Sequence, residues 1–200
     1  MTTVAGTRVS DEVLAQLYAE ARTFSRWLPR SVEPALLHEL YEWVKFGPTS
    51  ANSQPGRFWF VTSAEGKEQL KAALAPGNVD KTMAAPVTVI VAYDTRFHDL
   101  LPKAFPQVDA RSWFEGNDEL IEQTGRRNSA LQGGYLMIAA RALGLDCGPM
   151  SGFDAALVDR TFFPDGRYRS NFLCNLGYGE RASLHGRNPR LSFDEACRLV

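Results

Sequence analysis

The sequence predicts a mixed layer fold of helices and strands, of the α/β or α+β class. Helical and strand-like patterns alternate along the 200 residues. The run from Val87 to Tyr93 is nearly all apolar and β-branched, as expected of a central strand covered on both faces. The longest helical pattern, residues 118–145, carries one apolar stripe. No repeat or linker divides the chain, so we expect a single domain over residues 1–200.

Two helices and a strand open the chain. Ser10 begins a first helix, and Ser31 begins a second one with an apolar face. The second helix must end at Gly47-Pro48, because Gly accepts a left-handed terminal conformation and Pro cannot extend a helix. Residues 57–62 then form a predicted strand.

The middle of the chain holds a third helix and an irregular segment. Ser63 caps this helix, and Pro76-Gly77 is expected to stop it, which places Asn78 and Lys81 in a connection. Residues 94–117 are rich in Pro and aromatic side chains without clear periodicity. Such a stretch is typical of a lid or an insertion.

The last third contains a loop, a short helix, a strand and a tail. Residues 147–152 are interpreted as a loop after the long helix, which Gly144 ends. A short helix and an alternating strand, residues 171–178, follow. Residues 180–200 are expected to form a C-terminal arm that packs on a partner chain.

Composition limits the function classes. Lys plus Arg number 22 and Asp plus Glu 23, so no overall field favours nucleic acid or an anionic membrane. No apolar run is long enough to span a bilayer. The three cysteines, Cys147, Cys174 and Cys197, suit reduced thiols in the cytoplasm, and no Cys or His pair has metal-ligand spacing.

Polar groups at element boundaries are the candidates for chemistry. The densest is the loop within Phe46–Phe60, between a helix end and a strand, although a solvated connection would have the same composition. Together the groups suggest a site for a phosphorylated planar cofactor, with cations for phosphate and short polar groups for a heteroaromatic edge. They are Arg22 to Arg26, Pro48 to Asn52, Asn78 with Lys81, Met150 to Gly152, and Arg187 with Arg190.

The order of these motifs resembles a known family. R-T-x-S-R, G-P-T-S-A-N-S-Q-P, G-N-x-x-K, G-P-M-S-G-F-D and R-N-P-R-L occur in the order found in the nitroreductase family of FMN-dependent oxidoreductases. The resemblance covers nearly the whole chain. D-A-R-S-W-F and P-R-L-S-F-x-E-A add a likeness to the malonic semialdehyde reductase branch, which serves uracil degradation.

The resemblance implies an α+β three-layer sandwich, with a mostly antiparallel central sheet flanked by helices, in an intertwined homodimer. Two FMN sites would lie at the subunit interface. The implied cofactor-binding residues are Arg22, Thr23, Arg26, Pro48, Thr49, Ser50, Asn52, Asn78, Lys81, Met150, Ser151, Gly152, Arg187 and Arg190. Family patterns differ at Phe24, Ser151 and Gly56-Arg57, which puts side-chain roles there in question.

The implied chemistry takes place on the flavin, without a catalytic side chain. NADPH or NADH would be a transient hydride donor, and malonic semialdehyde would be reduced to 3-hydroxypropionate. Arg111, beside Trp113 and Phe114, is the predicted substrate-carboxylate contact; a surface salt bridge with Asp109 or Glu115 is the alternative. Two other functions stay open: a broad nitro, quinone or enone reductase, and a flavin-binding or flavin-fragmenting protein without reductase turnover.

Overall fold

A four-stranded antiparallel sheet forms the centre of the protein, in a computed structural model that describes residues 6–200. The spatial order is β1 (Gly56–Val61), β2 (Val87–Asp94), β4 (Tyr168–Gly177) and β3 (Asp146–Met150). All eight residues of β2 are buried, as the β-branched run predicted. The predicted α+β class with an antiparallel sheet is confirmed.

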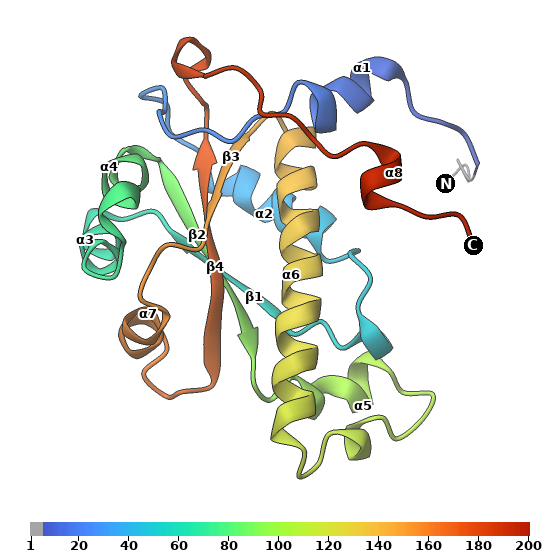
Figure 1. Ribbon diagram of the computed structural model, residues 1–200. Coiled ribbons are helices and arrows are strands. Elements are labelled where there is room, and N and C mark those ends of the chain that lie inside the picture. The colour runs from blue at the N-terminus through green and yellow to red at the C-terminus, as the bar shows by residue number, and fades with distance from the viewer. Residues whose placement is uncertain (1–5) are drawn as a thin grey trace.

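Helices cover both faces of the sheet (Figure 1). The helices α2 (Pro34–Val44) and α6 (Asp118–Ala142) pack on one face over a core that includes Leu40, Val89 and Leu136. Three shorter helices cover the other face, over a core that includes Leu70, Ile90 and Leu173. They are α3 (Ala64–Lys71), α4 (Pro76–Ala84) and α7 (Ala155–Phe162).

Small residues on α6 serve packing within the chain. A Cβ atom at Gly133 would lie 2.4 Å from the Phe172 ring of β4, and one at Gly125 would lie 2.4 Å from the Tyr93 ring of β2. Both glycines therefore let the helix approach the sheet, and substitution would cost about 1–3 kcal/mol through overpacking. Gly144 follows the helix with φ +79°, the left-handed conformation expected after a helix end.

Two predictions about secondary structure were wrong. Pro76-Gly77 begins α4 rather than ending α3, because Pro fits the first helical turn, where its missing N–H is not needed. Asn78 and Lys81 therefore lie on a helix. Residues 147–150 form the edge strand β3 rather than a loop, and Pro149 is tolerated there because only one neighbouring strand needs pairing.

The helices nearest the two ends of the described chain lie on the side of the C-terminal end of α6 (Figure 1). Ser10 caps α1 (Asp11–Leu14), which continues as a π-helical turn, Ala15–Ala19. After a 3₁₀ turn, Arg181–Ser183, the terminal segment crosses to α8 (Phe193–Ala196). No helix within residues 6–200 has the length and apolar character needed to cross a membrane.

Residues 94–117 pack around a small separate core. The segment contains a 3₁₀ turn, Phe97–Leu100, the four-residue helix α5 (Leu101–Ala104) and a second 3₁₀ turn, Arg111–Trp113. Its buried side chains are Phe97, Leu101, Ala110 and Phe114. This cluster is separate from the two cores that flank the sheet.

Candidate functional site

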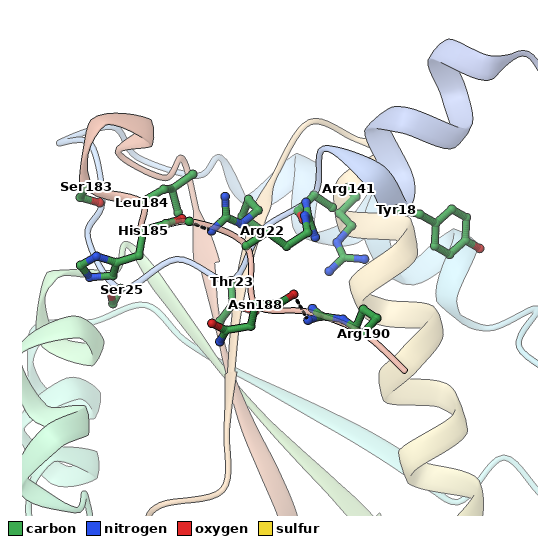
Figure 2. A pocket seen from close by; sticks show the side chains of 13 residues that line it. Tyr18, Arg22, Thr23, Ser25, Arg141, Ser183, Leu184, His185, Asn188 and Arg190 are labelled. Atoms are coloured by element: carbon green, nitrogen blue, oxygen red, sulfur yellow. Dashed lines mark hydrogen bonds between the residues drawn. The ribbon is translucent and has the colours of Figure 1, made fainter. Parts of the chain in front are cut away.

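A cleft of about 650 Å³ lies where the segment after the π-helical turn meets the C-terminal segment. Figure 2 shows its side chains, which come from three parts of the chain far apart in sequence. Four of the predicted cofactor residues line it: Arg22, Thr23, Arg187 and Arg190. Arg26 does not; it is exposed, and its carbonyl accepts a hydrogen bond from the Glu180 N–H at 3.0 Å.

The cations of this cleft are oriented by backbone carbonyls rather than neutralised by acids. Arg22 donates to the His185 carbonyl at 2.5 Å, and Arg187 donates to the carbonyls of Ala19 and of Ala21. Arg190 donates to the Asn188 carbonyl at 2.9 Å. Among the described residues that line the cleft, none is acidic. The cleft therefore presents uncompensated positive charge, which favours an anionic ligand such as phosphate.

Arg141 is a cleft residue that the sequence did not reveal. It reaches the cleft from the last turn of α6 and donates to the Leu17 carbonyl at 2.9 Å. Its buried Nε has no hydrogen-bond partner within the described chain. A basic residue in the last turn of a helix is also explained by the helix dipole, so the sequence offered no signal that Arg141 faces residues 22 and 190.

The segment after Arg22 is fixed to the sheet and to α4. Thr23 forms a parallel bridge with Cys147 of β3, and the Phe24 N–H donates to the Cys147 carbonyl at 3.1 Å. The Trp27 indole N–H donates to the Lys81 carbonyl at 3.0 Å. The cation cleft, the edge strand and α4 are thus parts of one continuous wall.

The end of β3 and the start of α4 lie against each other in this wall. The Asn78 side-chain amide donates to the Gly152 carbonyl at 2.6 Å, and a Cβ atom at Gly152 would lie 2.5 Å from that amide nitrogen. Only glycine fits there without displacing Asn78. Ser151 is exposed, Met150 is buried, and the Met150 sulfur accepts a hydrogen bond from Thr82 at 3.5 Å. The structure therefore brings together Asn78, Lys81, Met150, Ser151 and Gly152.

Lys67 joins α4 to the sheet behind this wall through hydrogen bonds. Its ammonium group donates to the Thr82 carbonyl at 2.8 Å and to the Thr88 hydroxyl at 2.6 Å, and the residue is 6% exposed. Burial lowers the pKa of Lys67 to about 8, because it penalises the charged form. Asn175 completes the network by accepting from Thr88 and donating to the Lys81 carbonyl.

The loop from Pro48 to Gln54 lies elsewhere, along the middle of α6. Its Ser50 N–H donates to the buried Asn128 side chain at 2.8 Å, and the Asn52 side chain donates to the Ala104 carbonyl at 2.7 Å. No residue of the loop lines the cation cleft. Three of its non-glycine residues have positive φ angles, which stores strain typical of functional loops. They are Ala51 (50°), Asn52 (46°) and Gln54 (42°).

Gly56-Arg57, the departure noted in the sequence, has a structural explanation. The Gly56 N–H donates to the Gln132 side-chain oxygen at 2.7 Å, and a Cβ atom would lie 2.6 Å from that oxygen. Arg57 pairs with the fully buried Asp94 at 2.9 Å, as does Arg167. Burial acts to raise the pKa of Asp94, but hydrogen bonds from Arg167 and the Arg96 N–H and the Arg57 charge outweigh it and lower the pKa.

The predicted substrate residues do not form one surface. Arg111 lies 3.5 Å from a carboxylate oxygen of Glu115 and 3.7 Å from one of Asp99, so its charge is already compensated. Trp113 is exposed, whereas Phe114 is buried in the small core of the 94–117 segment. The salt-bridge interpretation of Arg111 holds with Glu115; among the described residues, Asp109 forms no ion pair with it.

The wall fits a phosphorylated, flat heteroaromatic group. Arginines at one end suit a phosphate monoester, and the Asn78 side chain and the glycine-bordered edge at residue 152 suit a planar ring with several acceptors. Within residues 6–200, no group of three His, Cys, Asp or Glu side chains is placed to hold a metal ion.

Comparison with known proteins identifies the family. The model of the Nitroreductase family matches residues 6–178. The chain belongs to the nitroreductase family. A protein of Ralstonia nicotianae, named as a candidate NADH dehydrogenase/NAD(P)H nitroreductase, is 62% identical over 188 residues, which cover 94% of this chain and 96% of the relative. A protein of the same description from Rhodopseudomonas palustris is 60% identical, covering 95% and 97% of the two chains.

Solved structures show the same nitroreductase-like fold. A candidate nitroreductase of Exiguobacterium sibiricum, crystallised in complex with FMN, superposes with a TM-score of 0.85 at 21% identity, covering 97% of this chain and all of that one. The candidate nitroreductase ydfN of Bacillus subtilis gives a TM-score of 0.84 at 23% identity, covering 94% and 98%. At these identities the likeness establishes the fold.

Proposed function

We propose that this protein is an FMN-dependent NAD(P)H oxidoreductase that works as a homodimer. The observation that carries the proposal is the cation cleft, in which four arginines face a space without a carboxylate at one end of a glycine-bordered wall. Membership of the nitroreductase family, the names of its 62% and 60% identical relatives and the FMN complex of a protein with the same fold support it.

Different residues of the wall would bind different parts of FMN. Arg22, Arg187 and Arg190 would bind the phosphate, with Thr23 and Arg26 near the ring oxygens and the ribityl chain. Asn78, oriented by the Gly152 carbonyl, and Lys81 would face the pyrimidine edge. The backbone at Met150, Ser151 and Gly152 would border the reactive edge. The bound flavin would supply hydride transfer at N5, with NADPH or NADH as the transient donor.

A second copy of the chain would complete the site. The loop containing Pro48, Thr49, Ser50 and Asn52 does not reach the cleft of its own chain, and large apolar side chains beside it are exposed. Tyr135 of α6 packs against Gly47, and Phe46 next to it is 72% exposed. Exposed apolar patches of this kind mark association surfaces. We therefore place this loop against the flavin of the partner, with residues 180–200 as an arm.

The acceptor we propose is malonic semialdehyde, reduced to 3-hydroxypropionate in the cytoplasm during pyrimidine degradation. The support is the likeness of D-A-R-S-W-F and P-R-L-S-F-x-E-A to that branch of the family. A broad nitro, quinone or enone reductase is the second candidate, favoured by the nitroreductase names of the relatives and by an enone reductase with the same fold at a TM-score of 0.82.

Anaerobic spectroscopy tests these proposals in one series. The purified protein should be yellow, elute as a dimer, lose its flavin absorbance on addition of NADPH or NADH, and regain it on addition of malonic semialdehyde. Reoxidation by nitroaromatics or quinones but not by malonic semialdehyde would favour the broad reductase. A yellow protein that neither nicotinamide cofactor bleaches would contradict the reductase function.

A further inference from the structure

A second pocket, separate from the cation cleft, lies beside the loop from Pro48 to Gln54, called here the strained loop. It encloses about 460 Å³ between the loop, α5 and α6, and residues Asn52 to Gln54 form part of its lining. None of the cation-cleft residues lines it, and none of its described lining residues is acidic. Its remaining lining residues are Tyr41, Gly56, Arg57, Leu100, Lys103, Ala104 and Gln132.

Two donors of this pocket lack acceptors within the described chain. The Ser53 hydroxyl is buried without a hydrogen-bond partner, and the residue is 2% exposed. Gln132 is 3% exposed, and its oxygen accepts from the Gly56 N–H at 2.7 Å. That bond fixes the orientation of the amide, since an N–H must face an oxygen. The NH₂ group of Gln132 is therefore left to donate elsewhere, and the described chain offers it no acceptor.

The charge of the pocket is positive. Lys103 of α5 forms no ion pair within residues 6–200. Arg57 is the other cation, but its guanidinium pairs with Asp94 and donates to the carbonyls of Gln54 and Gly56. Lys103 is thus the pocket cation that has no acidic partner among the described residues, and it lines the same pocket as the two donors without acceptors. An ionised carboxylate offers acceptors only and matches such a set.

We propose that this pocket binds the carboxylate of a small carboxylate-bearing acceptor, with Lys103 as the cation and Gln132 and Ser53 as supporting donors. The proposal rests on the proposed function, because the same loop is the one placed along the partner's flavin. It assigns substrate selection to Lys103 rather than to Arg111, whose charge is compensated by Glu115 and Asp99. A neutral quinone would make no use of these groups.

The test uses the full-length, FMN-loaded protein and three variants. Lys103→Gln removes the cation, and Gln132→Glu keeps the oxygen that accepts from Gly56 while replacing the free donor by an acceptor. Each should raise the KM for malonic semialdehyde about tenfold or more and leave kcat/KM for a neutral quinone unchanged. Lys71→Gln, which removes an exposed lysine from α3, is the matched control and should change neither value.

Direct binding separates this proposal from the proposed function. Malonate, which cannot be reduced by hydride at neutral pH, should bind the wild type in calorimetry and bind Lys103→Gln at least tenfold more weakly, whether or not the flavin turns over. Absence of malonate binding in the wild type, or equal binding in Lys103→Gln, would overturn the proposal. So would a loss that occurs in Arg111→Gln and not in Lys103→Gln.

Discussion

The cation cleft and the strained loop at residues 48–54 differ in what they offer a ligand: the cleft offers positive charge, and the loop offers a fixed backbone conformation. In the cleft, Arg22 and Arg190 donate to backbone carbonyls and have no acidic partner among the described lining residues. In the loop, the side chains are neutral and largely bonded within the chain, while Ala51, Asn52 and Gln54 hold left-handed conformations. The cleft therefore recognises charge, and the loop presents a fixed shape.

Their positions on α6 explain why one chain holds only part of the site. Arg141 lines the cleft at one end of the helix, and Asn128 anchors the loop 13 residues earlier. At 1.5 Å per residue this separation is about 20 Å along the helix axis. A loop anchored this far from the cleft of its own chain is better placed to contact a ligand in the cleft of a second copy, which is why we propose a shared site.

The largest effect should come from removing a charge of the cleft. Arg22→Ala and Arg190→Ala should each weaken FMN binding by roughly 100-fold, because each loses charge-assisted hydrogen bonds to phosphate. The flavin would then be lost during gel filtration. Titration with FMN and, in parallel, with riboflavin checks the reason: riboflavin lacks the phosphate, so its affinity should stay unchanged.

The control for this experiment is an arginine outside the cleft. Arg160 is exposed on α7 and does not line the cleft, so Arg160→Ala should bind FMN like the wild type. Full retention of FMN in both cleft variants would show that the phosphate lies elsewhere. An equal loss of FMN and riboflavin would point to damage of the fold instead.

Removing Asn128, which anchors the loop, should lower the stability of the protein rather than its selectivity for a phosphate. Asn128 is fully buried, accepts from the Ser50 N–H and donates to the Thr124 carbonyl at 2.8 Å. Asn128→Ala should lower the free energy of unfolding by about 2 kcal/mol, because it removes both bonds and leaves buried groups unpaired. Urea unfolding measures this loss, and Gln123→Ala, exposed on the same helix, should stay within about 0.5 kcal/mol of the wild type.

Flavin binding by Asn128→Ala sharpens the comparison. If the loop presents shape and the cleft recognises phosphate, FMN and riboflavin should lose affinity by the same factor in this variant. A loss confined to FMN would contradict the separation of the two regions.

A smaller effect is expected at the cleft residue that the sequence did not reveal. Arg141→Gln should weaken FMN binding about tenfold and leave riboflavin binding unchanged, because it removes one of the four positive charges that line the cleft. The effect is smaller than at Arg22 because the Nε of Arg141 is buried and another of its nitrogens is bonded to the Leu17 carbonyl, which leaves fewer donors to face the cleft. Unchanged FMN affinity would limit Arg141 to holding the π-helical turn in place.

The difference between Arg22 and Arg141 shows what a sequence conveys about a site. Arg22 sits in an ordered motif, and the order of motifs was enough to identify the family. Arg141 reaches the cleft only because α6 ends beside the segments at residues 22 and 190, which is a tertiary relation. Like Arg22, the central strand Val87–Tyr93 could be predicted from local sequence, because the residues of a buried strand are themselves apolar and β-branched.

The two wrong secondary-structure predictions involve prolines, which are compatible with more than one local structure. Pro76 both ends a helix and begins one, and the tertiary bond from the Ala75 N–H to the Gly152 carbonyl decides between them. Pro149 lowers the expectation of a strand, yet β3 lies at an edge, where only one neighbour pairs with it. Neither deciding contact can be deduced from the neighbouring residues in sequence.

The smallest predicted effect concerns Lys67, whose charge is buried under α4 while the cleft arginines keep theirs in solvent. Its pKa falls from 10.5 to about 8 on folding, so the unfolded chain binds more protons between these pH values and stability must rise with pH there. The penalty for the buried ammonium is fully present below pH 8 and absent above pH 10.5. Relative to Lys67→Met, the wild type should gain about 1 kcal/mol in the free energy of unfolding between pH 8 and 9. Urea unfolding of both proteins measures the difference, and a gap that stays constant with pH would mean that Lys67 keeps its proton in the folded state, as a cation balanced by the Thr82 and Thr88 oxygens.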